Sequence, residues 1–98
     1  MIGRITTAGA ITEYRVVTAG SHVVGIALGP DGALWFTDNG VGRIGRITLT
    51  GAITEYLIPT ASGGPFGIAA GPDGALWFAE NSANKIGRIS DPFVSASL

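Results

Sequence analysis

The stretch GPDGALWFAENSANKIGRI, residues 71–89, holds the strongest signal in the chain, because much of it occurs again 42 residues earlier. GPDGALWF begins at Gly29 as well as at Gly71, and IGRI begins at Ile2, Ile44 and Ile86. Residues 2–43 and 44–85 align without a gap and are identical at 25 of 42 positions. A period of about 40 residues is typical of propellers and other repeat proteins, whose units bury an apolar face only by stacking on a neighbour.

Each repeat divides into four short β-rich runs separated by Gly, Pro, Asp or Asn. The first two runs are continuously apolar, as expected for strands covered on both faces, whereas the last two alternate between apolar and polar residues. In the first repeat the expected strands are Val23–Leu28, Ala33–Asp38, Arg43–Thr48 and Ala52–Ile58. This pattern predicts an all-β fold, a β-propeller built from four-stranded antiparallel blades.

The order of these strands predicts how the chain is organised. Labelled A to D from the propeller axis outward, residues 1–90 read C-D-A-B-C-D-A-B-C, which we interpret as two tandem blades. Two blades per chain cannot close a ring, so we expect a homo-oligomer, with a six-bladed homotrimer favoured and an eight-bladed homotetramer as the alternative. A blade shared between chains would have one C strand too many, so either Met1–Thr6 or Ile86–Ser90 should be displaced. The tail, residues 91–98, departs from the repeat and is predicted to be a foreign or frayed end.

Composition narrows the range of partners. The 98 residues contain no cysteine, so oligomerisation or a metal, rather than disulfides, should stabilise so small a domain. The formal net charge is −1 and only 13% of residues are charged, which argues against nucleic acid or a membrane surface as a partner. No apolar stretch approaches the ~20 residues that span a bilayer, and a cytoplasmic location is the default expectation.

Residues 65–90, PFGIAAGPDGALWFAENSANKIGRIS, resemble a repeat of the virginiamycin B lyase (streptogramin lyase) family. Blades of that family carry P-x-G-I, G-x-D-G-x-x-W-F-T-E and N-x-I-G-R-I-T, and the resemblance extends over residues 2–90. It implies a seven-bladed propeller that opens a cyclic peptide antibiotic at its ester linkage by elimination, with a divalent cation and a histidine base. The position of the catalytic histidine, x of P-x-G-I, is Val24 in the first repeat and Phe66 in the second.

The resemblance also suggests metal ligands. The family's acidic ligands fall at the end of the W-F-T-E strand, here Asp38 and Glu80, and at the position two before x, here His22 and Gly64. In a propeller the D-to-A and B-to-C loops share one face, so His22, Asp38 and Glu80 should gather at the mouth of the central channel. An imidazole with carboxylates suits Zn²⁺ or Mn²⁺, and carboxylates alone suit Mg²⁺ or Ca²⁺.

Simpler interpretations of these residues stay open. His22 is the only histidine, and a lone loop histidine is commonly a solvated surface residue. Asp38 and Glu80 can equally cap loop amides. Three asparagines at or in the B-to-C loops are candidate ligand-binding residues: Asn39, Asn81 and Asn84.

Several other residues are expected to be structural. Asp31 and Asp73 lie in GPDG turns, and Trp35 and Trp77 should pack between blades. Arginines of the C strands should face glutamates of the D strands across the hairpins: Arg4, Arg46 and Arg88 with Glu13 and Glu55.

These observations support three functional hypotheses. The first is a non-catalytic or weakly binding lyase-like propeller fragment that forms a homo-oligomeric ring with a metal or small-ligand site at the channel mouth. The second is a metal-dependent hydrolase of an ester, lactone or phosphotriester, by analogy with six-bladed propellers of the paraoxonase type. The third is a streptogramin B lyase.

Overall fold

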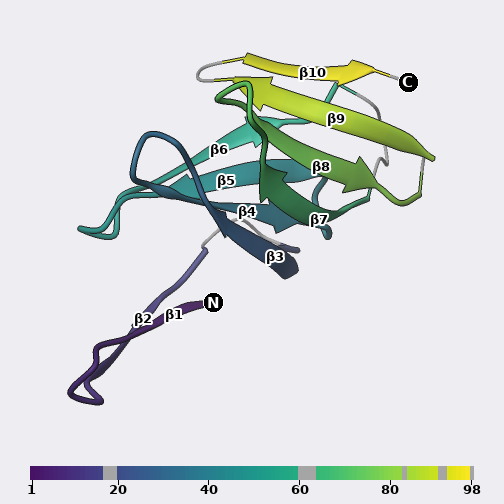
Figure 1. Cartoon of the computed structure of the whole chain (residues 1–98). Helices are drawn as coiled ribbons and strands as arrows, with labels where there is room; N and C mark the ends of the chain where they lie inside the picture. Colours follow the sequence, from purple (N-terminus) through teal and green to yellow (C-terminus); the bar gives the residue numbers. More distant parts are fainter. Residues whose placement is uncertain (17–19, 60–63, 83, 91–92, 98) are drawn as a thin grey trace.

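The fold is all-β, as predicted. The computed structural model describes residues 1–16, 20–59, 64–82, 84–90 and 93–97, and in these ranges it contains ten strands and no helix, hence none that could cross a membrane (Figure 1). The strands are β1 (Ile2–Ile5), β2 (Ile11–Tyr14), β3 (Val23–Leu28), β4 (Leu34–Asp38), β5 (Arg43–Ile47), β6 (Ile53–Leu57), β7 (Pro65–Ala70), β8 (Leu76–Glu80), β9 (Lys85–Ser90) and β10 (Phe93–Ser97).

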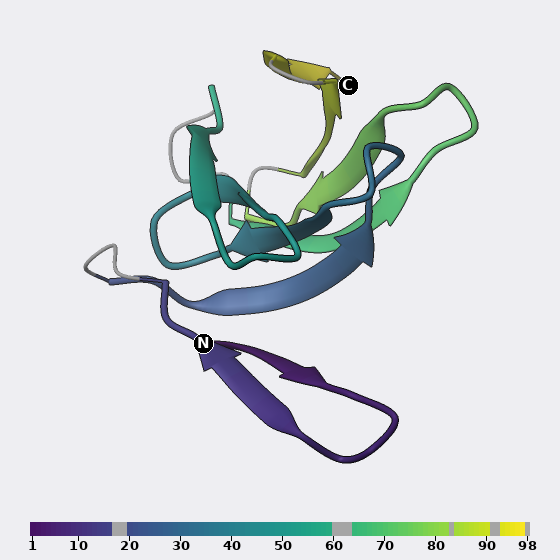
Figure 2. The same cartoon turned by 90° about the vertical axis from the view of Figure 1, so that its left-hand side faces the viewer.

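The strands form two antiparallel sheets and a hairpin. Blade 1 has the order β3-β4-β5-β6 and blade 2 the order β7-β8-β9-β10, so each follows the predicted A-B-C-D order. Strands β1 and β2 make a separate two-stranded sheet, which projects from the N-terminal side of blade 1 (Figure 2). The chain therefore consists of a C-D hairpin followed by two four-stranded blades.

The C-terminal segment differs from the prediction of a frayed end. Phe93–Ser97 form β10, which pairs with β9 in the register Val94↔Ile89 and Ser97↔Ile86. This strand takes the outer position that β6 has in blade 1, although its sequence is not that of the repeat. A free sheet edge can pair with any extended segment through backbone hydrogen bonds, which explains why the change of sequence does not prevent pairing. Residues 91, 92 and 98 of the predicted tail lie outside the described residues.

Each blade has two distinct faces, because successive side chains of a strand point to opposite sides of the sheet. We call one side the Trp face; it bears Trp35 and Ile44 in blade 1, and Trp77 and Ile86 in blade 2. The opposite side, the Phe face, bears Phe36 and Ile47 in blade 1, and Phe78 and Ile89 in blade 2.

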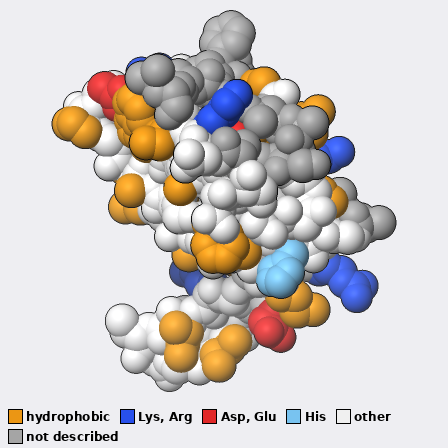
Figure 3. Space-filling view, turned by 90° about the vertical axis from the view of Figure 1, so that its right-hand side faces the viewer, with side chains coloured by type: hydrophobic (Ala, Val, Ile, Leu, Met, Phe, Trp, Pro, Cys, Tyr) orange, Lys and Arg blue, Asp and Glu red, His pale blue; other side chains and the backbone are white. Residues whose placement is uncertain are grey.

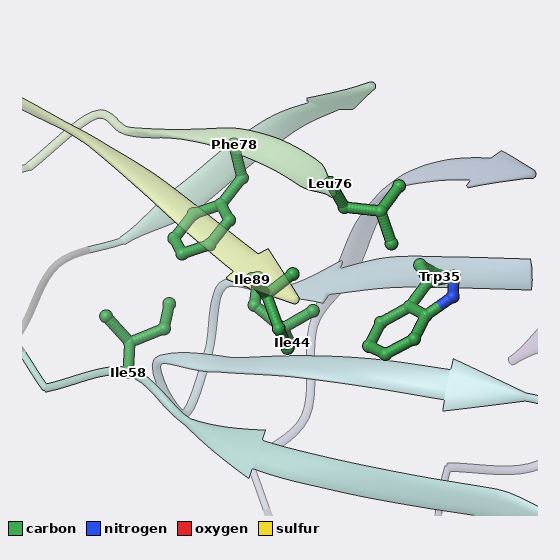
Figure 4. Close-up of a cluster of buried hydrophobic side chains, with 6 residues drawn as sticks. All are labelled: Trp35, Ile44, Ile58, Leu76, Phe78 and Ile89. Carbon is green, nitrogen blue, oxygen red and sulfur yellow. The ribbon is translucent and has the colours of Figure 1, made fainter. Parts of the chain in front are cut away.

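The main core lies between the two blades, where the Trp face of blade 1 packs on the Phe face of blade 2. Six buried side chains form it (Figure 4): Trp35, Ile44, Ile58, Leu76, Phe78 and Ile89. Trp35 also stacks on Tyr56, with ring centroids 5.8 Å apart and an interplanar angle of 20°. Burial of each such apolar side chain contributes about 1.5–3 kcal/mol, so the stacking of blades is the principal source of stability.

The β1–β2 hairpin covers part of the Phe face of blade 1 in the same manner. Ile2, which corresponds to Ile44, is buried against Phe36 and Ile47, and Tyr14 packs beside them. The hairpin has no A or B strand, so no tryptophan lies over Leu34. Leu34 is accordingly only half-buried, whereas its counterpart Leu76 is buried beneath blade 1.

The IGRI motif requires a glycine for a steric reason. Gly45 pairs across the ladder with Phe36, and a Cβ atom at Gly45 would overlap the Phe36 ring. Gly87 has the same relation to Phe78. A glycine at this position allows the aromatic ring to lie flat on the C strand.

The GPDG aspartate of each blade forms hydrogen bonds that join the A-to-B turn, the B strand and the C strand. These bonds confirm that the aspartates are structural. Asp31 Oδ1 accepts hydrogen bonds from the Ala33 amide (3.1 Å) and from Trp35 Nε1 (3.2 Å), and Asp31 Oδ2 accepts one from Arg46 Nε (2.7 Å). Asp73 repeats the arrangement in blade 2, with Arg88 Nε at 2.9 Å. Hydrogen bonds from Arg88, Trp77 and the Ala75 amide lower the pKa of Asp73 to about 2.

The predicted pairing of these arginines with D-strand glutamates is wrong. Arg46 lies opposite Thr54, and Arg4 opposite Thr12, because the hairpin turn sets the register one residue away from the glutamates. Glu55 instead lies 3.7 Å from Arg43.

Candidate functional site

The loops that precede the A strands and those that follow the B strands meet at one end of each blade, as predicted. The Asn39 amide donates to the His22 carbonyl (2.9 Å) in blade 1, and the Asn81 amide donates to the Gly64 carbonyl (3.0 Å) in blade 2. We call this the loop end. It holds all the candidate site residues.

Asp38 acts as a loop cap. Its side chain is fully buried and accepts hydrogen bonds from Ser21 Oγ (2.7 Å) and from the His22 amide (2.8 Å). The backbone of His22, rather than its ring, therefore meets the carboxylate. The residue itself is exposed, and the single histidine is visible on the surface in Figure 3. Capping of this loop therefore accounts for the buried carboxylate of Asp38.

Glu80 occupies the same position in blade 2 but lacks these partners. It is 1% exposed, and neither carboxylate oxygen has a hydrogen-bond partner among the described residues. Position 64 is glycine where blade 1 has His22, and position 63, the counterpart of Ser21, lies outside the described residues. Burying a carboxylate without partners is costly.

Glu80 also borders an open hollow at the loop end, of about 370 Å³. Asn81, Asn84 and Lys85 line it as well. Asn84 adopts a left-handed backbone conformation with φ 54°, and both asparagines are exposed. Asn39, by contrast, is committed to the fold, since its side-chain amide donates to the Pro65 carbonyl (3.1 Å) and links the two blades.

The three predicted metal ligands are not brought together within one chain. Over the ranges that the structure describes, no group of three or more His, Asp or Glu side chains could hold a metal ion. Asp38 and Glu80 belong to the loop ends of different blades, and His22 is exposed. Their convergence around the axis of a multi-chain ring stays a prediction.

Thr37 is an important residue that the sequence analysis did not identify. Its fully buried hydroxyl accepts a hydrogen bond from the Gly25 amide (2.9 Å) and donates one to the Phe66 carbonyl (2.6 Å), so it joins blade 1 to blade 2. Gly25 lies at an irregularity of the β3–β4 ladder between Val23 and Ile26, where its amide is available to a side chain. The glycine of the P-x-G-I pattern within a strand was the available signal.

The positions that resemble the catalytic histidine are apolar and accessible. Val24 is 40% exposed and Phe66 47% exposed, on the innermost strands β3 and β7, which lie against each other. Both follow the first residue of the strand and so lie toward the loop end. Val24 and Phe66 are thus exposed apolar residues near the loop end, and neither lines the polar hollow of blade 2.

The sequence model of the virginiamycin B lyase family matches residues 1–93. The chain belongs to this family. Three solved lyase structures resemble it closely. The selenomethionine-substituted virginiamycin B lyase from Staphylococcus aureus is 48% identical with a TM-score of 0.92, over 97% of this chain and 33% of that one. A streptogramin B lyase is 49% identical with a TM-score of 0.93, over 97% and 32%.

The third is a catalytically inactive histidine-to-alanine variant of the S. aureus lyase with quinupristin. It is 47% identical with a TM-score of 0.91, over 96% of this chain and 32% of that one. The chain thus spans about a third of the length of these lyases. No curated protein sequence matches it. The family assignment and the propeller blades predicted from the repeat are confirmed.

Proposed function

We propose that this chain is a ligand-binding segment of a virginiamycin B lyase-type propeller that holds a cyclic peptide at the loop end without opening it. The observation that carries the proposal is the pair Val24 and Phe66, at the positions that resemble the family's catalytic histidine. Elimination needs a base within hydrogen-bond reach of the proton that leaves. Neither side chain can accept a proton, whereas both offer exposed apolar surface.

The proposed ligand follows from the chemistry of this surface. Ligand sites combine apolar area with a few polar groups that fix orientation. Val24 and Phe66 supply the apolar area, and Asn81 and Asn84 supply amide donors and acceptors for the peptide backbone of a ligand. The similar S. aureus variant was crystallised with quinupristin, which makes that compound the first probe.

Of the predicted metal ligands, Glu80 fits a cation and Asp38 does not. The carboxylate of Asp38 is already occupied by Ser21 and the His22 amide, while that of Glu80 is buried without a partner among the described residues. Glu80, with the side-chain oxygens of Asn81 and Asn84, would give an all-oxygen site, which suits Mg²⁺ or Ca²⁺ rather than Zn²⁺. A bound cation would supply positive charge that polarises an ester carbonyl.

The family relationship favours lyase ancestry over the metal-dependent hydrolase as the origin of this site. The two reactions leave different products. Elimination opens an ester without changing the mass of a cyclic ligand, while hydrolysis adds one water.

The test is calorimetric titration of quinupristin into the 98-residue chain, with and without Mg²⁺, followed by chromatography and mass spectrometry of the ligand. We expect binding that strengthens with Mg²⁺ and a ligand recovered intact. Phe66→Ser should weaken binding, whereas Leu49→Ser, at an exposed apolar residue in the turn between β5 and β6, should not. Glu80→Gln should abolish the strengthening by Mg²⁺ but leave binding without Mg²⁺ unchanged. Absence of binding would refute the ligand, and a ring-opened product of either mass would refute the non-catalytic role.

A further inference from the structure

The Trp face of blade 1 is buried against blade 2, whereas the equivalent Trp face of blade 2 is exposed. Trp35 is 2% exposed and Ile44 0% where blade 2 covers them, but their counterparts Trp77 and Ile86 are 37% and 50% exposed. The same residue types occupy equivalent positions, so the difference is due to the missing neighbour. The surface that fits here is the Phe face of another blade.

A complementary gap lies at the other side of the chain. Strand β1 pairs only with β2 among the described strands, whereas its counterparts β5 and β9 each also pair with a B strand. Because the hairpin lacks A and B strands, Ile26 on the Phe face of blade 1 is half exposed and Leu34 only half-buried. Their counterparts in blade 2 pack into the core. The free edge of β1 and the open part of this Phe face both require an A-B strand pair.

We propose that copies of this chain assemble head to tail by strand exchange, in which β1–β2 of one copy replaces β9–β10 beside β8 of the preceding copy. The resulting composite blade has the order β7-β8-β1-β2. The 42-residue period sets its register. Thr37↔Ile44 in blade 1 becomes Ala79↔Ile2 between copies, and Trp35↔Arg46 becomes Trp77↔Arg4.

The side chains of β1–β2 fit this position better than the sequence of β10 does. Tyr56, opposite Ile44, stacks on Trp35 in blade 1, but the residue opposite Ile86 in blade 2 is Ser97. Tyr14 lies opposite Ile2, so the exchanged hairpin brings a tyrosine to Trp77. Arg4 likewise takes the place of Arg88 at Asp73, in the contact that Arg46 makes with Asp31.

The exchange leaves the hairpin on the Phe face of its own blade 1, where Ile2 and Tyr14 already pack. Strands β7 and β8 of the preceding copy then cover Ile26 and Leu34. Each chain contributes one complete blade and two halves of composite blades, so the ring has an even number of blades. Of the two C strands that compete for one position, the displaced one is β9. Asn84 and Lys85 then leave the hollow with β9, so in the assembled ring the contacts proposed above for a cation and a ligand rest on Glu80 and Asn81.

Gly3→Ala tests this arrangement without disturbing the fold of a single chain. A Cβ atom at Gly3 would meet nothing within 4 Å, but in the composite blade Gly3 takes the place of Gly87, where a Cβ atom would overlap the Phe78 ring. Native mass spectrometry of the 98-residue chain should show an oligomer, which Gly3→Ala dissociates while its far-ultraviolet spectrum stays unchanged. Thr12→Ala, at an exposed position of β2, is the matched control and should remain oligomeric.

Cysteine trapping supplies a second measurement. Because the chain has no native cysteine, only the introduced cysteines can form disulfides. The pair Ile2→Cys and Ala79→Cys should form disulfides between copies, seen as a ladder on a non-reducing gel. The pair Ala79→Cys and Ile86→Cys, opposite each other within one chain, should give less intramolecular disulfide in the oligomer than in the Gly3→Ala background. A parent chain that stays monomeric, or an oligomer insensitive to Gly3→Ala that forms no cross-link between Ile2→Cys and Ala79→Cys, would overturn the proposal.

Discussion

Replacing Thr37 by valine should destabilise the contact between the blades far more than the small change in shape suggests. Valine keeps the branched volume but removes the hydroxyl that serves the Gly25 amide and the Phe66 carbonyl. Each buried group left without its partner costs about 1–3 kcal/mol, so the loss of both hydrogen bonds should cost about 2–6 kcal/mol. For a domain of this size, 1 kcal/mol corresponds to about 4–8 °C in melting temperature, so the fall should be at least about 8 °C.

Two variants isolate the hydroxyl in this experiment. Thr37→Ser keeps the hydrogen bonds and loses one methyl group, for about 1 kcal/mol. Ala79→Val places valine at the equivalent exposed position of blade 2 and should be neutral in the single chain. Urea and thermal unfolding would be followed by far-ultraviolet circular dichroism at one fixed protein concentration, because assembly makes the midpoint depend on concentration. If Thr37→Val proves as stable as Thr37→Ser, the hydroxyl does not join the blades and the reasoning fails.

Three further predictions concern packing and charge. In the dissociated Gly3→Ala background, Gly45→Ala should lose a further ~1–3 kcal/mol in urea unfolding, because its Cβ meets the Phe36 ring; the absence of any further loss would contradict this cause. Trp35→Ala should cost about 3–5 kcal/mol and Trp77→Ala clearly less in the dissociated chain; equal losses would mean that Trp77 is covered there. Acid should destabilise the protein through the GPDG turns. The pKa of Asp73 is lowered to about 2, and that of Asp31 is lowered although burial opposes it, because Arg46, Trp35 and the Ala33 amide donate to its carboxylate. Both aspartates therefore stabilise the fold above their unfolded pKa of ~3.9 and lose this effect as the pH falls through their lowered folded-state pKa. The double variant Asp31→Asn/Asp73→Asn should show a flatter loss of melting temperature between about pH 5 and pH 2, and a profile as steep as that of the parent would show that other groups are responsible.

The repeat made the architecture predictable from sequence. The period, the apolar A and B strands and the turn residues fixed the strand order, and the GPDG aspartates were correctly interpreted as structural. The pairs of residues that face each other across a hairpin were harder to predict from the sequence. The arginines were matched to glutamates by charge, but register depends on the backbone of the turn, and a shift of one residue moved Arg46 from Glu55 to Thr54. The strand at Phe93–Ser97 was missed because pairing at a free edge needs no repeat sequence.

The candidate site was only partly predictable for a different reason. The repeat places Asp38 and Glu80 in equivalent positions, yet their surroundings differ: Asp38 accepts hydrogen bonds from Ser21 and the His22 amide, whereas Glu80 has no hydrogen-bond partner among the described residues. Sequence comparison identifies positions, whereas the partners of a buried carboxylate depend on loops that vary between repeats. The role of Thr37 depends on a ladder irregularity and a close approach of strands from two blades, neither of which is a local property of the sequence.

The Asp31 and Asp73 networks tie the A-to-B turn, the B strand and the C strand of each blade into one unit, while contacts between blades are mainly apolar. Apolar contacts are non-directional, whereas charge-assisted hydrogen bonds hold a defined geometry. A blade should therefore behave as a stiff plate, and deformation should concentrate in the angle between plates. Small changes of that angle, summed around a ring, alter how many plates close it. The same 42-residue unit can then serve rings of different blade number without any change inside the blade.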